Sequence, residues 1–341
     1  MDRRAFILLA AGLAGSAKAL RADHHVISSD PLEVESDLAS LAGRYTTLED
    51  FYVRNHYRAP EPAGTPLLTI EGEVAKPCRL ETSDLNRLAN RELGAVLECA
   101  GNPVGTRVLA SNGDWSGWSF ADTLGLAQPA KTASYVHLFG RDGYARSVDL
   151  ERVMSDGMLA RSLNGRPLGQ NHGTPWRALF PGWYGMDSVK WLERIVVSTD
   201  PLPAVGTAYL EARKAANGQV ALQPLPRMQV KSVIVSPVSG SVVNRGKIEV
   251  RGLAWTGEGT ISGVEVSSDG GVHWSAAFRD PGGRYEWTPW RCLVDLTKAG
   301  AVELTCRATD SRGRTQPEKR EAARLDGYAN NWYHRVRCVV V

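Results

Sequence analysis

The chain has 341 residues, enough for about two domains with a sizeable core in each. Its net charge is +3 and it has no dense basic block, so composition gives no reason to expect nucleic acid or a membrane surface as a partner. The five cysteines form no CxxC or CxxCH sequence, which argues against a zinc ribbon, a redox dithiol and a covalently attached c-type haem. Any electrons released by this chain are therefore expected to leave through another protein.

The N-terminus places two arginines, Arg3 and Arg4, directly before an apolar run over residues 5–17. This run is too short to span a bilayer in a mature protein, so it indicates a signal and not a membrane anchor. Residues 1–22 resemble a twin-arginine export signal, a route that carries folded, cofactor-loaded proteins. We therefore expect a periplasmic protein, the alternative being a cytosolic chain with a chance Arg-Arg start. In an exported chain, an odd number of cysteines leaves at least one unpaired.

The next part of the chain reads as an arm followed by a mixed domain. Residues 23–49 are polar and mixed in charge, which predicts an N-terminal arm that wraps around a folded domain. Strands are predicted over 67–74, before Cys99 and over 134–140; helical segments are predicted from Ser83, with Thr82 or Ser83 as the N-cap, and over 150–163.

Short apolar segments recur after about Gln223 and are separated by turns such as residues 268–271. This spacing is typical of an antiparallel β-sandwich, so a second domain is predicted over residues 225–341. The sequence leaves open whether an apolar face of this sandwich is covered by the first domain or by a partner chain.

Cys99 follows the apolar run 94–97 and is followed at once by two small residues and Asn102. A strand is therefore expected to deliver the sulfur into a loop with room beside it. A thiolate in that setting suits a metal that accepts sulfur ligands. Taken alone, however, a free cysteine is more often a small buried hydrophobe.

Three polar motifs accompany Cys99. Residues 54–56 offer a guanidinium, an amide and an imidazole, which can hold phosphate and heterocycle edges by hydrogen bonds. His172 and Arg177 flank a Gly-Thr-Pro break, so only a loop that folds back can bring both to one anion. Residues 188–190 add a hydroxyl, backbone N–H groups and an ammonium. A turn cluster or a surface salt-bridge loop is the structural alternative for these motifs.

Two other features allow two interpretations each. Trp115 and Trp118 lie between glycines, which suits a wall beside a pocket and equally suits core anchors. Asp142 precedes Gly143, which suits an acid beside a ligand and equally suits a routine hairpin turn.

Four segments, 51–56, 97–102, 171–177 and 182–192, resemble in order and approximate spacing the motifs of the sulfite oxidase family of molybdenum enzymes. The resemblance covers nearly the whole chain after the first forty residues or so. It implies an α+β fold class, with a sulfite-oxidase-type mixed α/β molybdopterin domain over residues 50–220 and an immunoglobulin-like β-sandwich that serves dimerisation. It also implies one molybdenum–molybdopterin cofactor, no haem domain and a homodimer.

The resemblance assigns roles to individual residues. Cys99 would bind the metal through its thiolate. The expected cofactor-binding residues are Asn55, His56, Cys99, Asp142, His172, Arg177, Ser188, Val189 and Lys190. The expected residues near the substrate are Arg54, Tyr209 and Arg335, the last of these on a C-terminal strand that reaches back to the pocket.

The activity implied by the resemblance is oxygen-atom transfer to sulfite, giving sulfate, with two electrons passed to an external cytochrome c. The chain departs from the family at Pro103 and Val104, where sulfite-oxidising members generally carry one or two arginines. Arg107 is the candidate that would replace this charge. Alternatively the pocket is less positive and the substrate is an S-oxide, such as methionine sulfoxide, that is reduced. A third possibility is a binding protein that has kept the fold and lost the metal.

Overall fold

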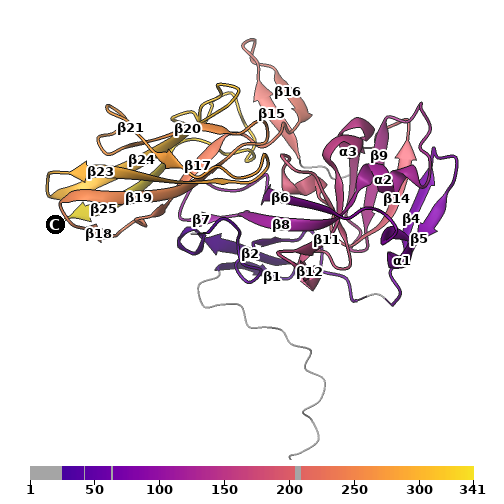
Figure 1. Ribbon diagram of the computed structural model, residues 1–341. Helices are drawn as coiled ribbons and strands as arrows, with labels where there is room; N and C mark the ends of the chain where they lie inside the picture. Colours follow the sequence, from indigo (N-terminus) through magenta and orange to yellow (C-terminus); the bar gives the residue numbers. More distant parts are fainter. Residues whose placement is uncertain (1–24, 42, 63, 204–208) are drawn as a thin grey trace, which may run out of the picture.

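Figure 1 shows the computed structural model, which describes residues 25–41, 43–62, 64–203 and 209–341. The expected export signal, residues 1–22, lies outside the described residues. Within the described ranges, no helix is both long and apolar enough to cross a membrane.

The first domain contains three sheets. The first has the order β1–β2–β3, with β7 also paired to β2; the second has the order β10–β9–β14–β4–β5; the third has the order β12–β11–β8–β6, with β13 also paired to β11. Their bounds are β1 (His25–Ser29), β2 (Leu32–Asp37), β3 (Val53–Arg54), β4 (Leu68–Gly72), β5 (Cys78–Leu80), β6 (Arg91–Glu98), β7 (Arg107–Val108), β8 (Ala110–Ser119), β9 (Tyr135–Gly140), β10 (Ala145–Asp149), β11 (Met158–Leu163), β12 (Arg166–Pro167), β13 (Arg177–Leu179) and β14 (Leu192–Ser198).

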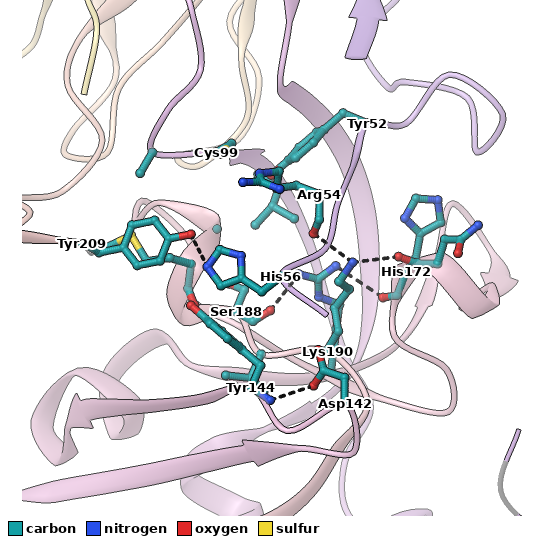
Figure 2. A pocket seen from close by; sticks show the side chains of 17 residues that line it. Tyr52, Arg54, His56, Cys99, Asp142, Tyr144, His172, Ser188, Lys190 and Tyr209 are labelled. Carbon is teal, nitrogen blue, oxygen red and sulfur yellow. Dashed lines mark hydrogen bonds between the residues drawn. The ribbon is translucent and has the colours of Figure 1, made fainter. Parts of the chain in front are cut away.

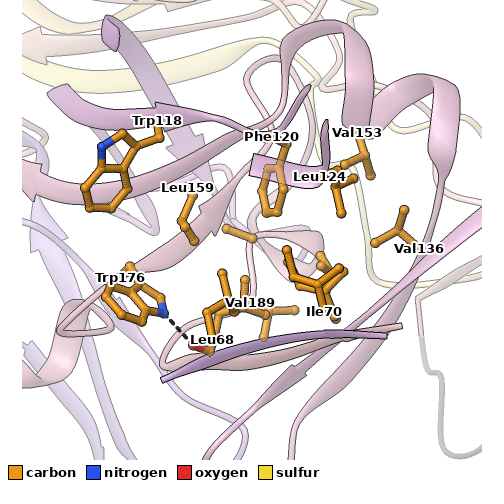
Figure 3. Packing of buried hydrophobic residues seen from close by; sticks show 14 of the residues in the cluster. Leu68, Ile70, Trp118, Phe120, Leu124, Val136, Val153, Leu159, Trp176 and Val189 are labelled. Carbon is orange, nitrogen blue, oxygen red and sulfur yellow. Dashed lines mark hydrogen bonds between the residues drawn. The ribbon is translucent and has the colours of Figure 1, made fainter. Parts of the chain in front are cut away.

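The helices of the described chain are short. They are α1 (Thr82–Leu85), α2 (Phe120–Gly125) and α3 (Leu150–Asp156), with 3-10 turns at Leu38–Ser40, Gln170–His172 and Gly185–Asp187. The core of the domain packs α2 and α3 against the second and third sheets, as Figure 3 shows for Phe120, Leu124 and Val153 beside Ile70 and Leu159.

The second domain is a β-sandwich, and the predicted α+β fold class with a C-terminal sandwich is confirmed. One sheet has the order β17–β19–β23–β22 and the other β18–β25–β24–β20–β21. Their bounds are β17 (Lys231–Ser236), β18 (Val242–Val243), β19 (Gly246–Trp255), β20 (Ile261–Ser267), β21 (Ser275–Ala276), β22 (Phe278–Arg279), β23 (Thr288–Leu296), β24 (Gly300–Asp310) and β25 (His334–Val340). A hairpin, β15 (Leu210–Lys214) and β16 (Val220–Pro224), lies between the two domains in the chain and projects from the molecule in Figure 1.

Several local predictions differ from the structure. The helix expected over 150–163 ends at Asp156, because Gly157 is extended and the following residues form β11, which pairs with β8. The N-cap of α1 is Glu81, which forms a capping box with Asp84, and not Thr82 or Ser83. The expected arm, residues 23–49, contributes two strands and buried apolar residues to the fold.

The two tryptophans between glycines are core anchors. Trp115 is fully buried, and Trp118 is 1% exposed within the main core of the domain. All five cysteines are free, so none of them forms a disulfide.

A buried ion pair joins the two domains directly behind Cys99. Glu98, the last residue of β6, accepts hydrogen bonds from the Lys231 ammonium (3.2 Å), the Trp255 indole (2.8 Å) and the Asn102 amide (2.9 Å). Lys231 also donates to the carbonyl of Pro103 at 3.2 Å. Because both charges are removed from water, each depends on the other for its solvation. The first strand of the sandwich therefore fixes the chain on both sides of Cys99.

Replacing Lys231 by methionine is expected to destabilise the protein by about 3–5 kcal/mol, because it leaves the Glu98 carboxylate buried without its counter-charge. Thermal unfolding followed by circular dichroism measures the effect, with Lys247→Met, an exposed lysine of the same sandwich, as the matched control. An unchanged midpoint for Lys231→Met would contradict the account, whereas partial recovery in the double variant Glu98→Gln/Lys231→Met would support it.

His334 makes a second buried junction contact. Its Nδ1 accepts from the Ile234 N–H at 3.1 Å, so in the neutral ring Nε2 carries the proton toward the Gly105 carbonyl at 3.0 Å. Burial lowers its pKa from 6.5 to about 4. Between about pH 6.5 and 4, the imidazole therefore binds a proton in the unfolded chain but stays neutral in the folded chain. The free energy of unfolding therefore decreases as the pH falls from about 6.5 toward 4.

The variant His334→Gln is expected to lose stability at neutral pH and to show a shallower decline of the unfolding midpoint below pH 6.5 than the parent. Midpoints measured at half-unit steps of pH give both slopes. Parallel curves for parent and variant would show that the protonation of His334 does not cause the loss of stability at low pH.

Candidate functional site

A pocket opens at the end of β6, where Cys99 enters a tight turn. Figure 2 shows residues from β3, from the β9–β10 turn and from two later loops converging on it. The lining residues are Tyr52, Arg54, His56, Leu97, Cys99, Ala100, Asp142, Tyr144, Asn171, His172, Arg177, Gly185, Met186, Ser188, Val189, Lys190 and Tyr209.

The turn that carries Cys99 is held by the backbone and by Asn102. The Cys99 N–H donates to the Leu109 carbonyl at 2.8 Å, and the Asn102 side-chain oxygen accepts from the Leu109 N–H at 2.8 Å. Burial raises the pKa of the Cys99 thiol, and the nearby Arg54 guanidinium opposes that rise. A coordinated metal ion would deprotonate this thiol outright. The geometry suits a ligand more than a packing residue, because the sulfur faces the pocket.

Two cations also line the pocket, Arg177, which is buried, and Lys190, which is half-buried. The Lys190 ammonium donates to the carbonyls of Arg54 (3.1 Å) and Asn171 (3.0 Å) and to the side-chain oxygen of Asn55. The Arg177 guanidinium donates to the carbonyls of Ser188 (2.8 Å) and His172 (3.3 Å). Within the described chain, neither cation has a carboxylate within ion-pair distance, although the negative charge of Asp142 in the same pocket opposes part of the fall in the pKa of Lys190.

The pKa values of Lys190, Arg177 and His172 show that the pocket disfavours the charged form of each group. Burial lowers the pKa of Lys190 well below its ordinary value and lowers that of Arg177 to about 10. Burial and the two neighbouring cations lower the pKa of His172 to about 3, so its imidazole is neutral. An anion in the pocket would supply the missing counter-charge for both cations.

A second unsatisfied group lies beside them. The side-chain nitrogen of Asn55 is buried and has no hydrogen-bond partner among the described residues. An orphaned amide donor next to two uncompensated cations is typical of a site that a polar ligand completes. Asp142 lines the same region, and its side chain accepts from the Tyr144 N–H at 3.1 Å, so it serves both the turn and the pocket.

His56 and Tyr209 lie together on the Cys99 side of the pocket. Their rings stack at 5.5 Å with an angle of 4°, and the Tyr209 hydroxyl lies 2.6 Å from His56 Nε2. Tyr144 packs edge-on against the same imidazole at 4.7 Å. Burial and the charge of Arg54 lower the pKa of His56 to about 4, so the ring is neutral at physiological pH and the pair shares one hydrogen bond.

Most of the residues selected from the sequence meet in this pocket. Those that line it are Arg54, His56, Cys99, Asp142, His172, Arg177, Ser188, Val189, Lys190 and Tyr209. Asn55 is buried and reaches the same site through Lys190.

Arg107 does not lie in the pocket, so it does not replace the charge missing at residues 103 and 104. It lies on β7, opposite Asp37 of β2, and lines a separate groove that also contains Leu38 and His334. The physical reason is strand pairing, because β7 pairs with β2 in the register Asp37–Arg107 and Ser36–Val108 and so holds Arg107 beside the N-terminal arm.

Arg335 also lies away from the pocket. The alternation of β25 turns His334 and Val336 into the fold, and the Arg335 side chain therefore faces outward. It pairs with Glu303 at 3.4 Å and with Glu318 at 3.5 Å. The expectation that this arginine reaches back to the substrate is not met in the described chain.

The sequence reading missed several lining residues. Tyr52 and Tyr144 are aromatic neighbours of selected residues, and Met186 and Gly185 lie within the segment 182–192 that carries Ser188. These residues could have been predicted because each lies within a few positions of a selected residue in the sequence. Tyr144 in particular follows Asp142 by two positions and donates its hydroxyl to the Met186 carbonyl at 2.8 Å, which ties the two loops together.

The comparisons with known proteins agree with this geometry. Residues 57–205 match the oxidoreductase molybdopterin binding domain, and residues 223–340 match the Mo-co oxidoreductase dimerisation domain. The chain is 31% identical to sulfite oxidase of Gallus gallus, over 86% of this chain and 72% of that protein. It is 32% identical to the mitochondrial sulfite oxidase of Drosophila melanogaster, over 92% of this chain but only 63% of that protein.

A solved structure of a related enzyme has the same fold. The sulfane dehydrogenase SoxCD from Paracoccus pantotrophus superposes with a TM-score of 0.84 at 26% identity, over 96% of this chain and 93% of that chain. The chain therefore belongs to the sulfite oxidase family and is a molybdopterin-dependent oxidoreductase.

Proposed function

We propose that this protein oxidises sulfite to sulfate with a molybdenum–molybdopterin cofactor and passes the electrons to an external c-type cytochrome. The observation that carries the proposal is a guanidinium, that of Arg54, beside the Cys99 thiol in a pocket that also holds two uncompensated cations. The names of two relatives, both sulfite oxidases, support sulfite as the substrate. The same proposal includes export to the periplasm and a homodimer formed by the second domain.

The residues present fit the cofactor. The Cys99 thiolate would bind the metal, while Lys190, Arg177 and the orphaned amide of Asn55 would hold the anionic and polar parts of the pterin. His172 is neutral and lies between these groups, so it would offer a hydrogen bond without adding charge. When bound, the cofactor supplies the two-electron oxygen-atom transfer.

The remaining residues would position the substrate. The Arg54 guanidinium, whose Nη1 is engaged by Glu33 and the Asn55 carbonyl, can donate its remaining N–H groups to a sulfur oxoanion beside Cys99. Tyr209, held by His56, would place a hydroxyl donor on the same side. Preorganised donors of this kind stabilise charge as it redistributes during the reaction. In the overall reaction, sulfite and water give sulfate, two protons and two electrons. The two electrons would pass to two one-electron carriers.

A second candidate is the reduction of an S-oxide such as methionine sulfoxide. The observation that favours it is the position of Arg107 and Arg335 outside the pocket, which leaves Arg54 as the guanidinium acting on Cys99. A neutral S-oxide needs fewer positive groups than a sulfite dianion.

Sulfite-dependent reduction of cytochrome c and of ferricyanide, by protein of confirmed molybdenum content, separates the two candidates. The proposal predicts turnover with sulfite and none with methionine sulfoxide and a reduced dye. Turnover only in the reverse assay would replace sulfite oxidation by S-oxide reduction, and inactivity in both assays would reject both candidates.

The variant Cys99→Ser is expected to lose about 10²-fold or more of the sulfite turnover, because the hydroxyl is a poor substitute for a thiolate ligand. Pterin content, measured by fluorescence of the released pterin, is expected to persist because Lys190 and Arg177 are intact. Cys78→Ser, a partly exposed cysteine on β5, is the control. Full activity of Cys99→Ser would remove the cysteine from the metal site.

A further inference from the structure

An acidic residue of the N-terminal arm pairs with the arginine beside Cys99. In the antiparallel pair of β2 and β3, Glu33 lies directly opposite Arg54, and the two side chains form an ion pair. The pair is partly shielded, with 17% of the Glu33 side chain and 34% of the Arg54 side chain exposed. Cross-strand neighbours are held together by the backbone register, so this contact is a fixed feature of the fold.

Arg54 is the cation that acts on the substrate side of the pocket. Its guanidinium points toward Cys99 in Figure 2, and it lowers the pKa of that thiol by charge and by a hydrogen bond. The other two lining cations, Lys190 and Arg177, are turned to backbone carbonyls around His172. The charge available to a substrate therefore depends on how much of the charge of Arg54 remains after pairing with Glu33.

We propose that Glu33 is a specificity-determining residue that offsets Arg54 and so reduces the advantage that Arg54 gives to a sulfur oxoanion with two negative charges over one with a single charge. The substrate class is a singly charged oxoanion such as hydrogen sulfite, so the inference rests on the proposed function and narrows it. The repulsion between the Glu33 carboxylate and a bound anion is proportional to the charge of that anion. A dianion is penalised about twice as strongly as a monoanion at the same position.

The test compares two anions in molybdenum-loaded protein at low ionic strength, where screening is weak. Sulfate carries two charges and methanesulfonate carries one, and their dissociation constants are measured by isothermal titration calorimetry. Glu33→Gln is expected to tighten sulfate binding by about three- to tenfold and methanesulfonate binding by about the square root of that factor. Because the proposed substrate is a monoanion, the KM for sulfite is expected to fall by the same factor as the methanesulfonate dissociation constant, with a smaller change in kcat.

Two variants serve as controls. Glu35→Gln removes the same charge from the same strand, but Glu35 pairs with His25 at 3.1 Å, so its loss is expected to leave both dissociation constants unchanged. Glu33→Asp keeps the charge and is expected to preserve the parent's ratio of the sulfate and methanesulfonate dissociation constants. Equal thermal midpoints for the four proteins show that the fold is intact.

Equal effects of Glu33→Gln on both anions, no effect on either, or the same shift in Glu35→Gln would overturn the inference. Failure of either anion to bind any of the proteins would overturn it as well. A parent enzyme that does not turn over sulfite rejects the proposed function, whereas a charge-dependent shift in Glu33→Gln would still establish the charge selection by Glu33.

Discussion

The cations of the pocket are the constraint on which the rest of this site depends. Arg177 is buried and Lys190 is half-buried, and both donate to backbone carbonyls, without a carboxylate within ion-pair distance in the described chain. Such charges are costly unless an anion completes them. The loops that carry them are therefore organised for a bound anionic group, and the protein is expected to gain stability when that group binds.

The surrounding structure serves to fix the cysteine relative to these cations. The sandwich holds the turn after β6 through Lys231, which binds Glu98 on one side of Cys99 and the carbonyl of Pro103 on the other. The N-terminal arm holds Arg54 through Glu33. Both additions to the molybdopterin domain thus reach residues next to Cys99, so the β-sandwich and the arm take part in shaping the site.

The predicted fold class is confirmed, and most of the selected residues line one pocket, because they lie within short motifs. Cys99, His172, Arg177 and Lys190 each belong to a segment whose internal spacing brings them together once the loops close. Glu33 could not be found in this way, since its relation to Arg54 arises from the register of two strands that are distant in the chain.

The errors have the same physical origin. Arg107 and Arg335 were selected by residue type and order, but the direction of a side chain depends on strand register and on contacts with the other domain. The alternation of β25 turns Arg335 outward, and the pairing of β7 with β2 places Arg107 in another groove. Helix prediction over 150–163 failed at Gly157 because pairing of β11 with β8 outweighed the helical spacing.

A crystal structure of the molybdenum-loaded protein shows most directly whether one anionic cofactor contacts Lys190, Arg177 and Cys99 at the same time. The account predicts metal density bonded to the Cys99 sulfur, with an anionic part of the pterin within hydrogen-bonding distance of Lys190 and Arg177. A metal bound away from Cys99, or a pterin whose anionic part contacts neither cation, would contradict it.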